Sequence, residues 1–131
     1  MKFLKSILIW LLFIPVAILN GALREEILYN AFGNFTAQVI SGILLSIGII
    51  LISWLLLPKL GKGEVQDYIL IGIIWAILTN LFDLIFILVE NRPIDDFIAM
   101  FDVTTGNLWI LVIITLLLTP ILVAKKRKMI L

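Results

Sequence analysis

Residues 37–62 read AQVISGILLSIGIILISWLLLPKLGK, and this stretch decides the fold. The run Ala37–Leu57 carries no charged residue, and it ends at Pro58 and a turn that bears two lysines. At a rise of about 1.5 Å per residue, a helix of this length crosses the roughly 30 Å of hydrocarbon in a bilayer. The stretch therefore predicts a transmembrane helix that ends at a membrane surface.

Three similar apolar runs flank this one, so that spans are expected at about residues 7–23, 37–57, 69–89 and 108–124. The chain has 131 residues, of which 63% are hydrophobic and 15% are charged. A soluble domain of this size has too little interior to bury so much apolar surface. We therefore expect an all-α membrane protein in which residues 1–131 form a single bundle of four transmembrane helices.

The positive charges fall on one side of this alternating map. Threading the four spans in order places one set of cations on the side of both termini: Lys2, Lys5, Lys59, Lys62, Lys125, Lys126, Arg127 and Lys128. Arg24 and Arg92 fall on the opposite side. Because short loops rich in Lys and Arg stay in the cytoplasm, we expect a multi-pass protein of the cell membrane with cytoplasmic N- and C-termini. No small-x-small cleavage site follows the first run, so the first helix is expected to be retained.

Composition also limits the chemistry. The chain has no cysteine and no histidine, which excludes disulfides and the common zinc, haem and thiol sites. The acidic residues on the side of Arg24 match no calcium-loop motif, so neither a cofactor nor a metal is expected. The one basic run, Lys125–Lys128, directly follows a span. Such a run is typical of contact with anionic lipid heads rather than with nucleic acid.

The connections between spans carry their own signals. Asn30, Gly33 and Asn34 indicate a turn over Tyr29–Thr36, and the short loop Lys59–Gly63 predicts that the second and third helices are antiparallel neighbours. The longest connection begins with Pro93, followed by two acids that suit a helix N-terminus. Its apolar residues recur at helical spacing, which predicts a short amphipathic helix between spans three and four: Ile94, Phe97, Ile98 and Phe101.

Asp83 is the most informative single side chain. It lies about seven residues inside its span, roughly 10 Å from the helix end, where a carboxylate costs about 2.5–3.5 kcal/mol on insertion scales. It should face inward and have a partner. Of the two cations on that side, Arg24 lies near the right depth in the membrane and is the expected partner of Asp83. Glu25 and Glu90 compete with Asp83 for Arg24.

Other polar side chains can complete a cluster around this pair. Thr79, Ser41 and Gln38 can join Asn20 and Asn80 in a hydrogen-bonded cluster. The candidate ligand-binding residues are Asn20, Arg24, Glu25, Asn80 and Asp83. One interpretation is a polar pocket, open to the outside, for a small anionic or amphiphilic ligand. The other is a structural ion pair and amide network that fixes the order of the helices. The sequence leaves both open.

Several short motifs resemble a group of small prokaryotic four-span membrane proteins. They are Asn20-Gly21-x-x-Arg24-Glu25, Ser41-Gly42, Leu57-Pro58, the Thr79–Asp83 segment and Gly106-x-Leu108-Trp109. The family more often has Glu where Asp83 stands, followed by an aromatic-glycine step that this chain lacks. The resemblance implies four spans and the location of a site, and it carries no activity with it.

Three functions follow from these observations. The first is a transporter or ligand-binding membrane protein that uses Arg24 and Asp83, in which an arginine can hold an anionic head group. The second is an accessory or assembly subunit of a membrane complex. The third is a membrane enzyme acting on a lipid or isoprenoid head group, which is disfavoured because no histidine can serve as a base. The expected partners are membrane lipid and, for a transport path, a second copy of the chain or a larger complex.

Overall fold

The structure is a computed structural model that describes residues 2–130. Within this range, four helices are long and apolar enough to cross a membrane, which confirms the predicted all-α bundle. The first span comprises α1 (Lys2–Leu23), a π-helical turn η1 (Arg24–Leu28) and α2 (Tyr29–Phe32). The second comprises α3 (Asn34–Leu56), which continues into the 3-10 turn η2 (Leu57–Leu60).

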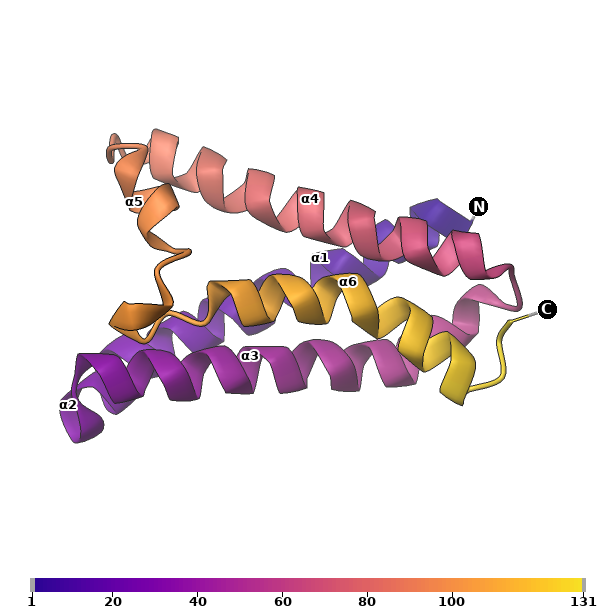
Figure 1. Ribbon diagram of the computed structural model, residues 1–131, viewed down its shortest axis with the longest axis horizontal. Coiled ribbons are helices and arrows are strands. Elements are labelled where there is room, and N and C mark those ends of the chain that lie inside the picture. The colour runs from indigo at the N-terminus through magenta and orange to yellow at the C-terminus, as the bar shows by residue number, and fades with distance from the viewer. Residues whose placement is uncertain (1, 131) are drawn as a thin grey trace.

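The second half of the chain forms the other two spans. The third span is α4 (Val65–Val89), which starts with a capping box formed by Glu64 and Asp67. A short helix α5 (Asp95–Ala99) and a 3-10 turn η3 (Val103–Thr105) precede the fourth span, α6 (Trp109–Lys126). The four long helices run alternately up and down, so both termini and the α3–α4 connection lie at one end of the bundle (Figure 1). The helix predicted between spans three and four is thus present as α5.

The connection between the first two spans is tighter than the sequence suggested. Helix continues as far as Phe32, and Asn34 already starts α3. Gly33 alone separates them, with φ 83° and ψ 172°. Glycine takes this conformation without the Cβ clash that other residues meet. The predicted turn over Tyr29–Thr36 is therefore wrong in its length, because one glycine reverses the chain.

The predicted packing of the second span against the third is also wrong. The described contacts of α3 and α4 are made chiefly with α6, which packs against both. A Cβ at Gly42 would lie 2.7 Å from Cβ of Leu108, and a Cβ at Gly72 would lie 2.4 Å from the carbonyl oxygen of Leu117. The last helix therefore takes the place between α3 and α4 because both present glycine to it.

The interior is held by buried aromatic residues. Trp75 is fully buried, and its indole N–H donates to the carbonyl oxygen of Ser6 at 2.9 Å. Its ring lies edge-on to Phe13, 5.0 Å between centroids. Nearby, the indole of Trp10 donates to the Thr79 hydroxyl at 2.9 Å. These contacts fasten α1 to α4 in the half of the bundle that contains the termini.

The C-terminal segment closes the same end. The Gly63 N–H donates to the carbonyl oxygen of Met129 at 2.9 Å, and the Tyr68 hydroxyl donates to the carbonyl oxygen of Gly61 at 3.0 Å. Arg127 donates to the carbonyl oxygen of Trp54 at 3.2 Å and lies over its ring. We call this the basic end, defined by Lys59, Lys62 and Lys125–Lys128.

The acidic residues of the long connection serve local structure. Asp96 Oδ2 accepts from Nε of Arg92 at 2.9 Å. Asp102 accepts from the backbone N–H of Thr104 at 3.0 Å. Hydrogen bonds from the Thr104 hydroxyl and backbone lower the pKa of Asp102, which is fully exposed. These carboxylates therefore order the connection that covers the end opposite the basic end.

Candidate ligand-binding cavity

A cavity of about 570 Å³ lies at the end opposite the basic end. Residues of α1, α3 and α6 line one side of it, and residues of α4 line the other. Trp75 and Trp10 tie α1 to α4 nearer the basic end, whereas toward the opposite end α4 diverges from the other long helices (Figure 1). The cavity occupies the space that this divergence leaves.

Arg24 enters the cavity wall from the first residue of the π-helical turn η1. Turns of this kind often occur at functional sites. Its side chain is half-buried, and Nη1 reaches the Ser41 hydroxyl at 3.5 Å, the limit of a hydrogen bond. A guanidinium has five N–H donors. Within residues 2–130 no carboxylate pairs with this one.

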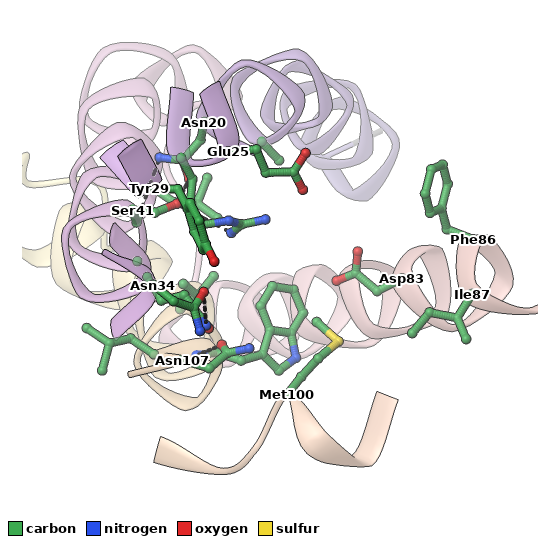
Figure 2. A pocket seen from close by; sticks show the side chains of 18 of the residues that line it. Asn20, Glu25, Tyr29, Asn34, Ser41, Asp83, Phe86, Ile87, Met100 and Asn107 are labelled. Atoms are coloured by element: carbon green, nitrogen blue, oxygen red, sulfur yellow. Dashed lines mark hydrogen bonds between the residues drawn. The ribbon is translucent and has the colours of Figure 1, made fainter. Parts of the chain in front are cut away.

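Asn20 and Ser41 form the wall behind Arg24. Asn20 Nδ2 donates to the carbonyl oxygen of Ser41 at 3.0 Å, and the Ser41 hydroxyl donates back to Asn20 Oδ1. Both residues line the cavity (Figure 2). This reciprocal pair fastens α1 to α3. Asn20 is therefore at the expected site, but its amide is occupied by helix packing.

Asp83 faces the cavity from α4, opposite Glu25 (Figure 2). Its Oδ2 atom is buried and has no hydrogen-bond partner among the described residues. The expected ion pair between Asp83 and Arg24 is not formed. The reason is geometric, because the two residues stand on helices that diverge at this end. Glu25 is exposed and forms no ion pair within the described residues.

Asn80, the remaining candidate, acts beside the cavity rather than in its wall. Its Nδ2 donates to the carbonyl oxygen of Ala76 at 2.9 Å, and its Oδ1 accepts from the Trp109 indole at 3.2 Å. Trp109 does line the cavity, and its backbone N–H donates to Asn107 Oδ1 at 3.0 Å. Asn80 therefore positions an aromatic wall residue.

The rest of the wall contains one expected residue and several that the sequence did not single out. Gln38 was expected, and its Nε2 donates to Asn34 Oδ1 at 3.1 Å. The lining residues that the sequence reasoning missed include Tyr29, Asn34, Met100, Asn107 and Trp109. They lie in the connections between the spans or at the start of the fourth span. The clustering of asparagine near the ends of these spans was the one signal available.

The cavity continues toward the bundle centre as a narrow apolar extension of about 70 Å³. Its walls come from all four spans and include Phe13, Ile49 and Leu116. Ala17, Asp83 and Trp109 line both parts. The site is therefore amphiphilic, with a wide polar chamber at the bundle end, a thin apolar extension below it, and Asp83 at the junction.

Comparisons of this chain with family models, curated proteins and solved structures find no match. Functional inference therefore depends on the cavity itself. Its titratable lining residues are Arg24, Arg92, Glu25 and Asp83, and Arg92 is already paired with Asp96. This set offers one unpaired cation and a buried acceptor, which suits binding of a polar ligand better than acid–base chemistry.

Proposed function

We propose that this chain is a small integral membrane protein whose cavity binds an anionic amphiphile. The observation that carries the proposal is the half-buried guanidinium of Arg24, which faces a large cavity without a carboxylate partner in residues 2–130. Arginine presents a planar fork that matches the oxygens of a phosphate or carboxylate. The apolar extension below gives the same ligand a place for hydrocarbon.

The proposal includes an orientation in the cell membrane. The basic end carries Lys59, Lys62 and the run Lys125–Lys128, and the rule for short basic loops assigns it to the cytoplasm. The cavity then opens in the outer leaflet. A lipid of that leaflet holds its head outward and its chain toward the bilayer centre, which is the order of the polar and apolar parts of the cavity. Movement of the ligand across the membrane would require a second copy, because four spans form a narrow bundle.

Binding of a charged lipid to the purified protein tests this function. The probe is lysophosphatidylglycerol, a single-chain anionic lipid, compared with an uncharged monoacylglycerol of the same chain length. Native mass spectrometry after release from dodecyl maltoside micelles gives the affinity. We expect the anionic lipid to bind more tightly, and Arg24→Gln to weaken its binding by about tenfold or more, since a hydrogen bond to a charged group contributes about 1.5–3 kcal/mol.

Lys59→Gln is the matched control, because Lys59 is exposed at the basic end and does not line the cavity. It removes the same charge and should change the affinity by less than about twofold, since exposed charges beyond a Debye length are largely screened. Inorganic phosphate, added alone, separates a site for small anions from a site for lipids. Equal affinities of wild type and Arg24→Gln for lysophosphatidylglycerol would contradict the proposal.

A structural role is the second candidate, and the reciprocal hydrogen bonds of Asn20 and Ser41 favour it. In that case the polar cluster only fixes α1 against α3, as buried polar groups in membrane bundles often do. The protein would then be an accessory subunit. Arg24→Gln would lower stability in detergent, and neither lipid would bind in a way that depends on Arg24.

A further inference from the structure

The partly buried carboxyl of Asp83 faces the cavity at a point separate from Arg24. Its Oδ2 atom is buried without a hydrogen-bond partner in the described chain. Leaving a buried polar atom unpaired costs more than an average hydrogen bond contributes. Asp83 lines both the polar chamber and the apolar extension, and no described residue donates a hydrogen bond to either oxygen of its carboxylate. A ligand group that donates to this carboxylate must therefore sit where the head of an amphiphile meets its tail.

We infer that the ligand is a single-chain anionic lipid with a free hydroxyl at the junction of head group and chain, and that Asp83 accepts a hydrogen bond from that hydroxyl. This inference rests on the proposed function, because it takes Arg24 as the site of the anionic group. Lysophospholipids have this chemistry: one acyl chain, a phosphate and a free glycerol hydroxyl between them.

The dimensions of the two parts suit a head group in the polar chamber and the first part of a single chain in the apolar extension. The polar chamber of about 570 Å³ is large enough for a phosphoglycerol head. The apolar extension is narrow, about 70 Å³, and its lining includes Trp10, which contacts Thr79 and Phe82. A diacyl lipid would have to place its second chain outside the extension.

The charges near the junction are consistent with a hydroxyl donor. On α4, Phe86 and Ile87 lie next to Asp83 in the wall and carry no charge. Across the cavity stand Glu25, which is exposed, and Arg24, whose Nη1 contacts Ser41. No described side chain donates to the Asp83 carboxylate. A ligand hydroxyl can fill this role without adding a charge to the apolar side of the site.

A cycle that changes both protein and ligand tests the inference. The lipids are lysophosphatidylglycerol and its 2-deoxy counterpart, which lacks the hydroxyl, and the proteins are wild type and Asp83→Leu. We expect wild type to prefer the hydroxyl lipid by about tenfold, the size of a hydrogen bond to a charged group. Asp83→Leu should bind the two lipids equally, and its affinity for the 2-deoxy lipid should match that of wild type.

The outcomes separate this inference from the proposed function. If Arg24→Gln lowers the affinity for both lipids while wild type binds the two equally, the anionic site at Arg24 is supported and the role of Asp83 is refuted. If Arg24→Gln changes neither, the proposed function fails first. Asp83→Asn serves as a second variant if Asp83→Leu does not fold, and its preference for the hydroxyl lipid should fall below that of wild type. An unchanged preference would overturn the inference.

A paired substitution tests the place of the chain. Ala17 lines both parts of the cavity, whereas Ala22 is exposed and lines neither. Ala17→Phe should obstruct the junction and weaken lysophosphatidylglycerol by about tenfold, the order expected when a ligand's hydrocarbon loses its site. Ala22→Phe should leave the affinity unchanged. Equal affinities of the two variants would show that the chain does not enter the extension.

Discussion

The charged groups of Arg24 and Asp83 face one cavity without neutralising each other. Each is only partly buried, so water or a ligand in the cavity can solvate what the protein does not. This arrangement differs from a buried salt bridge, in which removing one partner leaves an uncompensated charge and costs several kcal/mol. Here the two side chains should contribute to stability independently.

Independence gives a measurable prediction for the double variant. The effects of Arg24→Gln and Asp83→Asn on the free energy of unfolding should add to within about 0.5 kcal/mol, as is usual for residues not in contact. Tryptophan fluorescence during unfolding by dodecyl sulfate in mixed micelles measures these values. Asn20→Leu with Ser41→Ala is the positive control, since these side chains exchange hydrogen bonds and should couple by about 0.5–3 kcal/mol. A similar coupling between Arg24 and Asp83 would contradict the structure.

For single residues, the sequence predicted where a polar side chain lies better than it predicted which residue that side chain contacts. An isolated carboxylate in an apolar span must face inward, and Asp83 does. Its partner could not be derived, because the reach of a long arginine allows many pairings and the choice depends on how far two helices diverge. Asn80 shows the same limit. Its position within the third span was predictable, but its hydrogen bond is with Trp109, which lies 29 positions later in the chain and begins α6.

At the scale of elements, the packing of α6 organises the bundle. It lies between α3 and α4 and approaches each where a glycine removes the side chain. Gly72 is the tighter of the two sites, because its hypothetical Cβ meets backbone atoms of Leu117 rather than a side chain. Backbone cannot rotate away, so the fit at Gly72 tolerates no added methyl group.

Gly72→Ala should therefore destabilise the protein. The new Cβ would lie 2.4 Å from the Leu117 carbonyl oxygen, and overpacking of this kind costs about 1–3 kcal/mol. Gly48→Ala is the matched control, since its Cβ would meet a Val16 methyl at 3.2 Å and should cost less than about 1 kcal/mol. Unfolding in mixed micelles again provides the comparison. Equal stability of the two variants would show that α6 does not pack closely on Gly72.

The spans were predictable from hydropathy, whereas their arrangement was not. Runs of apolar residues must be helical in lipid because their backbone groups have no other partners, and all four are. The small residues of the second and third spans, Gly42 and Gly72 among them, are of the kind that allows helices to pack closely in lipid. They did not say against which helix, because any span can use the same groove. The one-residue connection at Gly33 was hidden because neighbouring asparagines suggested a longer turn.

At the scale of the whole molecule, charge segregation and cavity position are linked. The basic end gathers Lys59, Lys62 and Lys125–Lys128, while the cavity lies at the other end. If the basic end is cytoplasmic, the proposed ligand comes from the outer leaflet or from the space beyond it. With the opposite orientation, the proposed ligand would come from the inner leaflet.

The absence of cysteine makes this orientation simple to measure. Lys128→Cys places one thiol at the basic end, and Glu90→Cys places one at the opposite end, where Glu90 is exposed directly after α4. With a membrane-impermeant maleimide, Glu90→Cys should react in intact cells and Lys128→Cys only after permeabilisation, because short basic loops remain in the cytoplasm. The wild-type chain has no thiol and gives the background. Labelling of Lys128→Cys in intact cells would show that the protein has the opposite orientation, and the proposed ligand would then be a lipid of the cytoplasmic leaflet.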